Sequence, residues 1–180
     1  IAGEAERLSH VADDVLLDYL NRNCDVADLV IVSPDAGGVK GATKLANHLE
    51  ADLAFVNKVR PKGTANQVVA TNIIGNVAGK RCILFDDIVD SAGTLCNAAA
   101  ALMAHGAKSV SAYVTHGVLS GAAADRVANS VLTELVVTDS IEASDTVKAC
   151  PKIRYVSCAP LIGEAIRRIA NEESVSKLFD

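Results

Sequence analysis

Short apolar runs alternate along the chain with stretches in which apolar residues recur at helical spacing. We expect strands at 28–32, 51–56, 71–77, 82–85, 109–115, 131–138 and 153–156. The helical periodicity of about 3.6 residues predicts helices at 13–21, 39–49, 95–105, 122–128 and 160–170. Strands that alternate with helices of this length indicate βαβ units. The pattern therefore predicts an α/β fold, with an open, mostly parallel sheet and helices on both faces.

Length and composition favour a single domain. A chain of 180 residues is long enough for one complete hydrophobic core. Half of the residues are hydrophobic but only 3% are aromatic, so the core must consist of Ala, Val, Leu and Ile, as in a parallel sheet covered by helices. The five cysteines, an odd number without CxxC spacing, indicate reduced thiols rather than disulfides or metal ligands.

Charge and hydropathy exclude several classes of partner. The formal net charge is −5, whereas proteins that bind nucleic acid usually carry an excess of positive charge. We therefore expect no nucleic-acid partner. The chain has no run of about 18 apolar residues and no basic leader followed by an apolar run, so we expect no membrane partner either. Together with the reduced cysteines, these patterns predict a cytoplasmic protein.

The stretch from Arg81 to Thr94 carries the strongest candidate chemistry. An apolar strand leads to two adjacent carboxylates, Asp86 and Asp87, and then to a turn of small residues before a helix. Ligands of open α/β sheets lie at the carboxyl ends of strands, and a loop that enters a helix offers N–H groups to a phosphate. Carboxylates can accept hydrogen bonds from sugar hydroxyls or hold Mg²⁺. We therefore expect a phosphate and a polyol side by side, bound by the carboxylates and by the turn residues Asp90, Ser91, Ala92, Gly93 and Thr94.

Two other segments give weaker signals. Asp35, Gly37 and Gly38 follow an expected strand and precede an expected helix, an order that can cradle a phosphate, although Asp35 could also simply cap the helix. Lys58 and Arg60 stand in a polar stretch punctuated by glycine and proline, where charged side chains usually form a solvated surface. Position alone assigns neither cation to a site.

The residues of these segments resemble a known family. Residues 83–94, ILFDDIVDSAGT, resemble the phosphoribosyl-diphosphate-binding motif of the type I phosphoribosyltransferases, whose fold is shared by the ribose-phosphate diphosphokinases. Five further segments resemble, in order, the C-terminal half of a class I ribose-phosphate diphosphokinase: VIVSPDAGGVK, FVNKVRPK, AYVTHGVLSG, ELVVTDSI and NEESVSKLF. The resemblance predicts a lead or linker over 1–15 and a phosphoribosyltransferase-like catalytic domain over 16–180.

The resemblance implies a reaction in which ATP and ribose 5-phosphate give 5-phosphoribosyl 1-diphosphate and AMP, with Mg²⁺ as cofactor. The anomeric hydroxyl of the sugar would attack the β-phosphorus of ATP. The turn from Asp90 to Thr94 would hold the 5-phosphate, and Asp86 would bind the ribose with Asp87 beside it.

The resemblance also gives roles to the two weaker segments. Asp35 would ligate Mg²⁺ near the diphosphate, beside the Gly37-Gly38 turn. Lys58 would be the catalytic lysine, with Arg60 beside it, on a loop that closes over the site. Diphosphoryl transfer needs charge neutralisation and in-line positioning more than covalent help, and Mg²⁺ with two cations can supply both.

The chain departs from the family pattern in several places, including the lead over 3–14, which differs from the family's linker and has Ser9 where an aromatic residue is expected. Family members normally begin with another α/β half that supplies much of the ATP site, and nothing in this sequence corresponds to it. Gly41 stands where the family usually has arginine, so a cation near the diphosphate is lost. The tail residues Ser174, Val175 and Ser176 match those that contribute to the family's allosteric site for phosphate and ADP.

Three functions remain open from the sequence. The favoured one is a ribose-phosphate diphosphokinase, or its catalytic domain, that assembles as a homo-oligomer. A phosphoribosyltransferase would instead consume the activated sugar, but the chain has no aromatic-bearing insert suited to stacking a base. A non-catalytic regulatory relative would bind the sugar phosphate without turnover; Gly41 and the missing half favour it, whereas Lys58 and Arg60 argue against it.

Overall fold

A seven-stranded sheet forms the centre of the computed structural model, which describes residues 15–22, 26–59 and 70–178. The strand order is β3-β2-β1-β4-β5-β6-β7, and every neighbouring pair is parallel except β2 and β3. The open, mostly parallel sheet expected from the sequence is therefore confirmed. Its strands are β1 (Leu29–Ser33), β2 (Asp52–Val59), β3 (Ala70–Ile74), β4 (Arg81–Val89), β5 (Ser109–Gly117), β6 (Leu135–Thr138) and β7 (Ile153–Val156).

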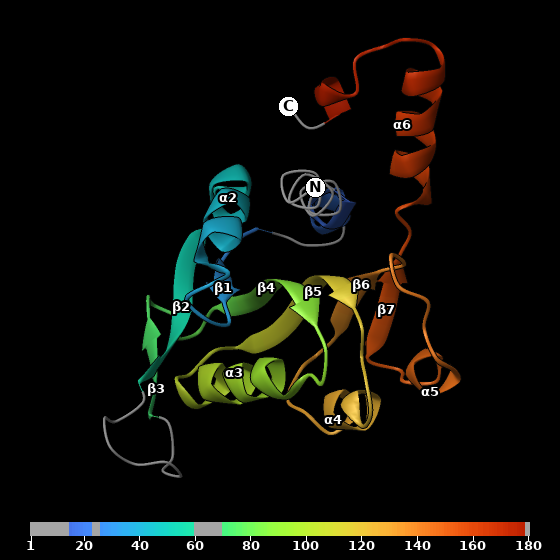
Figure 1. Cartoon of the computed structure of the whole chain (residues 1–180). Coiled ribbons are helices and arrows are strands. Elements are labelled where there is room, and N and C mark those ends of the chain that lie inside the picture. The colour runs from blue at the N-terminus through green and yellow to red at the C-terminus, as the bar shows by residue number, and fades with distance from the viewer. Residues whose placement is uncertain (1–14, 23–25, 60–69, 179–180) are drawn as a thin grey trace.

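Helices cover both faces of the sheet, as expected (Figure 1). The helix over 15–22 and α2 lie on one face, and α3 and α4 lie on the other. The helices after 15–22 are α2 (Val39–Leu49), α3 (Gly93–Ala104), α4 (Ala123–Ala128), α5 (Asp145–Lys148) and α6 (Ala159–Ala170), followed by the 3-10 turn η1 (Ser176–Leu178).

The core has two apolar layers, one on each face of the sheet. Side chains alternate between these faces along β4: Ile83 packs in the layer of α2, whereas Leu84 packs in the layer of α3. Leu16 and Leu102 anchor the covering helices, and both are fully buried. All five residues of β1 are buried, which explains why the central strands read as continuous apolar runs.

The structure corrects several expected boundaries. Strand β4 does not end at Phe85 but continues to Val89, because β5 also continues and pairs with it up to Gly117. Lys58 belongs to strand β2, opposite Thr71 of β3, rather than to a polar stretch after the strand. The strand expected over 131–138 begins only at Leu135, and the polar connection before β7 contains the short helix α5.

The described cysteines agree with the expectation of reduced thiols: Cys82, Cys96, Cys150 and Cys158 are all free, and three of them are buried. Cys24 lies outside the described residues. In the described part of the chain, no helix combines the length and the apolar character needed to span a membrane.

Helix α6 differs from the other long helices because it has no buried residue. It stands beyond β7, away from the two core layers (Figure 1). Ile162, Ile166 and Ile169 follow one side of it and are 51%, 61% and 66% exposed. These side chains recur at helical spacing, so α6 presents an apolar stripe that contributes nothing to either core layer.

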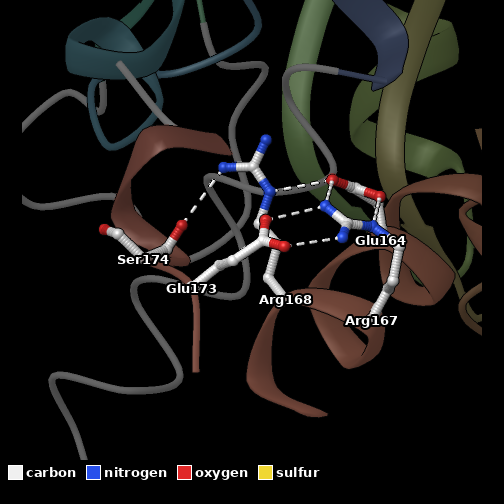
Figure 2. Close-up of polar contacts among 5 residues, drawn as sticks. All are labelled: Glu164, Arg167, Arg168, Glu173 and Ser174. Atoms are coloured by element: carbon white, nitrogen blue, oxygen red, sulfur yellow. Dashed lines mark hydrogen bonds and ion pairs between the residues drawn. The ribbon is translucent and has the colours of Figure 1, made fainter. Parts of the chain in front are cut away.

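Ion pairs hold the segment after α6 in place (Figure 2). Arg167 bonds both Glu164 and Glu173, with N–O distances from 2.8 to 2.9 Å. Arg168 reaches Glu164 at 2.8 Å and donates to the Ser174 carbonyl at 3.1 Å. The hydrogen bonds from Arg167 and then Arg168 lower the pKa of Glu164 to about 2. This network ties the predicted allosteric tail to α6.

Replacing Ile166 should leave the stability of the isolated chain unchanged. We expect Ile166→Ala to alter the free energy of unfolding by less than about 0.5 kcal/mol, because the side chain is 61% exposed and packs in neither core layer. Leu102→Ala is the matched control and should cost about 3 kcal/mol, because Leu102 is fully buried. Urea denaturation of both variants measures the difference. A loss at Ile166 as large as that at Leu102 would show that α6 packs on the chain.

Candidate functional site

A cavity of about 580 Å³ opens at the carboxyl ends of β1 and β4. Two segments line it: Asp35, Gly37, Gly38 and Gly41 after β1, and residues 85–95 at the end of β4 and the start of α3. The sequence placed both segments at such a position, and the structure brings them together around one cavity. This is the edge where open α/β sheets bind their ligands.

Two adjacent carboxylates occupy the β4 side of the cavity. Asp86 is half-buried and its Oδ1 accepts a hydrogen bond from the Asp87 backbone N–H at 3.0 Å. The pKa of Asp86 is raised from 3.8 to about 7. Burial is the main cause, and the nearby charges of Asp87 and Asp35 add to it, whereas that hydrogen bond acts in the opposite direction. The site thus concentrates negative charge that hydroxyl donors or a cation can offset.

The turn after β4 forms the start of α3. Ala92 is the N-cap residue, with φ of 60° and ψ of 5° in the left-handed region, and the helix begins at Gly93. The first intrahelical bond runs from the Cys96 N–H to the Ala92 carbonyl at 3.0 Å, so the preceding N–H groups have no partner within the helix. Unpaired N–H groups and the helix dipole together make this turn suitable for an anion.

The turn after β1 forms the opposite wall. The Oδ1 atom of Asp35 accepts hydrogen bonds from the N–H groups of Gly37 at 2.8 Å and Gly38 at 3.2 Å. A Cβ atom on Gly38 would come within 2.9 Å of Ser33 Oγ and 3.4 Å of Asp86 Oδ1. The approach to Ser33 Oγ is too close for any real Cβ atom, so the packing of this turn on the end of β1, beside Asp86, requires glycine at 38.

Gly41 lines the same cavity near an aromatic ring. A Cβ atom at this position would lie 3.6 Å from Cε1 of Phe85, which is an ordinary van der Waals contact. The backbone therefore leaves room for a larger side chain at 41. Phe85 and Ile88 also line the cavity. Neither residue is recognisable as a cavity residue from the sequence, because both are apolar residues of a strand.

Other predicted residues fall outside this cavity or outside the described residues. Lys58 belongs to β2, and Arg60 lies outside the described residues. Ser174 and Ser176 follow α6, where their hydroxyl groups lie 2.7 Å apart, and the tail contributes no lining residue to the cavity. The roles of all these residues remain predictions.

The described residues fit Mg²⁺ that arrives with a phosphate ligand. No group of three or more His, Cys, Asp or Glu side chains among them could hold a metal ion. Mg²⁺ is often held by one or two carboxylates together with substrate phosphates and water. Asp35 and Asp86 lie on facing walls of the cavity and their charges interact unfavourably, so a cation between or beside them would relieve that repulsion.

Comparisons with known proteins agree with this geometry. The family model described as "Phosphoribosyl synthetase-associated domain" matches residues 55–180. The chain belongs to the phosphoribosyl synthetase family. The resemblance read from the sequence motifs is thereby confirmed.

Two curated relatives and one crystal structure define the extent of the match. A ribose-phosphate pyrophosphokinase of Caulobacter vibrioides is 79% identical over 154 residues, which are 85% of this chain and 49% of the relative. One of Hyphomonas neptunium is 56% identical over 167 residues, 92% of this chain and 53% of the relative. A phosphoribosylpyrophosphate synthetase of Mycobacterium smegmatis superposes with a TM-score of 0.79 at 35% identity, covering 89% of this chain and 51% of that one. The chain thus spans about half the length of these phosphoribosyl synthetases.

The raised pKa of Asp86 predicts a pH-dependent effect of Asp86→Asn on stability. Because the folded-state pKa of about 7 exceeds the ordinary value of 3.8, Asp86 favours the folded state at low pH, and this contribution is lost as the pH rises through 7. At pH 8 we expect the variant to be more stable than the wild type by roughly 1–2 kcal/mol, after allowance for solvent screening of a half-buried group. Near pH 4 this advantage should disappear.

Chemical denaturation at pH 4 and pH 8 measures the difference. Leu102→Ala provides a control without a titratable group, because the loss of its buried apolar side chain should cost about the same at both pH values. Equal effects of Asp86→Asn at the two pH values would contradict a raised pKa at Asp86.

Proposed function

We propose that the protein acts as a ribose-phosphate diphosphokinase, which transfers the diphosphoryl group of ATP to the anomeric hydroxyl of ribose 5-phosphate. The observation that carries the proposal is the cavity itself, which places an anion-binding turn beside two carboxylates in a chain that is 79% identical to a ribose-phosphate pyrophosphokinase over 154 residues. The products are 5-phosphoribosyl 1-diphosphate and AMP.

The β4 side of the cavity would bind ribose 5-phosphate. The turn from Asp90 to Thr94 would receive the 5-phosphate, because α3 begins there with N–H groups that have no partner within the helix, and because Ser91 and Thr94 line the cavity. Asp86 and Asp87 would accept hydrogen bonds from ribose hydroxyls. Binding at both ends of the sugar would fix the anomeric hydroxyl beside the opposite wall.

The β1 side would receive the diphosphate of ATP. Its Gly37 and Gly38 N–H groups are held by Asp35 in a tight turn, and Asp35 would hold Mg²⁺ through its carboxylate. The bound Mg²⁺ would neutralise phosphate charge. The anomeric oxygen would bond to the β-phosphorus and release its proton to water. The bond from that phosphorus to the oxygen bridging it to the α-phosphorus would break, so that AMP leaves with that oxygen.

Lys58 and Arg60 would supply the remaining positive charge. Charge spreads over the transferred phosphoryl oxygens in such reactions, and cations near these oxygens are the main source of rate enhancement. Lys58 lies in β2, which is next to β1 in the sheet. This location supports a role for Lys58 near the turn after β1, where the diphosphate would bind. We also propose cytoplasmic activity and assembly as a homo-oligomer.

The leading test is the release of AMP by the full-length protein from ATP, Mg²⁺ and ribose 5-phosphate. We expect Lys58→Ala to lower kcat on the order of 100-fold or more, with a much smaller effect on ribose 5-phosphate affinity, because the lost cation acts mainly in the transition state. Lys44→Ala on the exposed side of α2 is the matched control and should keep wild-type kcat.

The possible outcomes separate the candidate functions. Failure of the full-length protein to release AMP would contradict the proposal. Binding of 5-phosphoribosyl 1-diphosphate without turnover on ATP or on any of a panel of bases would instead identify a regulatory relative, which the absence of a cation at Gly41 favours. Turnover on a base would identify a phosphoribosyltransferase.

A further inference from the structure

The connection between β5 and α4 holds the backbone of the anion-binding turn from one side. The Val89 carbonyl accepts hydrogen bonds from the N–H groups of Val118 at 3.0 Å and Leu119 at 3.2 Å. The next carbonyl, that of Asp90, accepts from the Ser120 N–H at 3.1 Å. The Ser120 hydroxyl also donates to the Asp90 carboxylate. Two successive peptide groups are therefore fixed by the same connection.

Arg126 extends this contact to a third peptide group. It belongs to α4, and its Nη1 atom donates to the Ser91 carbonyl. Arg126 does not line the cavity, although Ser91 does. The three successive carbonyls of Val89, Asp90 and Ser91 thus all point toward the connection or α4.

The planarity of the peptide bond determines where the matching N–H groups point. No peptide bond in the described chain is cis, and in a trans peptide the N–H points opposite to the C=O. The carbonyls of Val89 and Asp90 face the connection, and that of Ser91 faces α4. The N–H groups of Asp90, Ser91 and Ala92 therefore point away from these two segments. Successive N–H groups on one side of the backbone form a concave anion site, and the cavity lies along these residues.

Ala92 makes this support necessary. Its left-handed backbone, with φ of 60°, is strained for a residue with a Cβ atom. Such a conformation persists only where its surroundings hold it. The peptide group between Ser91 and Ala92 is the one that Arg126 contacts.

We propose that Arg126 is a positioning residue, assisted by Ser120, that orients the Ser91 and Ala92 N–H groups toward a phosphomonoester in the cavity. The proposal rests on the proposed function for its ligand, ribose 5-phosphate. Arg126 acts through the backbone and does not touch the ligand. A charged donor on the Ser91 carbonyl also polarises that peptide group, which strengthens its N–H as a donor to phosphate.

The substitution Arg126→Met tests this role without removing the helix. Helix α4 is anchored by the buried side chains of Ala123, Ala124 and Val127, so we expect the variant to fold. Residual dipolar couplings of ¹⁵N-labelled protein without ligand report the direction of each N–H bond. We expect the Ala92 N–H to reorient in Arg126→Met and to keep its direction in Arg154→Met, a control whose side chain pairs with Glu134 on the surface.

Ligand binding supplies the second measurement. Titration with ribose 5-phosphate should give about tenfold weaker affinity for Arg126→Met than for the wild type, a loss typical of one charge-assisted hydrogen bond. The downfield shift of the Ala92 amide proton on binding should be lost as well. Arg126→Lys keeps a charged donor and should restore part of both signals, which a purely structural role would not produce. The Ser120→Ala variant should have a smaller effect because its backbone N–H remains.

The two measurements distinguish the proposals. If wild-type protein does not bind ribose 5-phosphate, the proposed function fails, while the dipolar couplings still decide whether Arg126 orients the peptide. If Arg126→Met leaves the Ala92 N–H direction unchanged, the positioning role is overturned. The same follows if the direction changes but the affinity of Arg126→Met remains that of the wild type.

Discussion

The site depends on a change of environment along β4, from buried at Phe85 to solvent-accessible at Asp86 and Asp87. From Cys82 to Phe85 the strand has covering helices on both faces, so each of these four residues is apolar and buried. Beyond Phe85 the strand continues with Asp86 and Asp87, where the cover ends and carboxylates can meet a ligand. The parallel neighbour β1 ends at the same edge, and its turn brings Gly38 against Asp86. One strand therefore sets the position of both walls of the cavity.

The sequence predicted the layers and most of the cavity for physical reasons. Buried parallel strands require continuous apolar runs, and covering helices require a periodic apolar face, so both appear directly in the residue pattern. Asp35 and Asp86 were found because carboxylates next to apolar strands interrupt those runs. The boundary of β4 was not predictable, because its last residues are ordered by pairing with β5 rather than by their own composition.

Contacts between distant segments account for the rest of what the sequence missed. Ser91 and Arg126 are 35 residues apart, and no spacing rule connects an arginine on a short helix with a carbonyl in an earlier turn. The polar neighbours of Lys58 predict a loop at this position, whereas the structure has a strand that forms by antiparallel pairing with β3. For α6 the sequence predicts the element but not its packing. The helical periodicity of its apolar residues predicts the helix correctly, but it does not indicate what the exposed apolar stripe packs against.

The environment of Asp86 couples the binding of cations to the release of protons. A carboxyl with a pKa of about 7 is protonated in a substantial fraction of molecules at neutral pH. A cation that binds beside it favours the ionised form and displaces that proton into the solution. The heat measured by calorimetry will then include the ionisation enthalpy of the buffer, so the same binding event will give different apparent enthalpies in phosphate and in Tris. The intrinsic enthalpy is obtained only by extrapolation over several buffers.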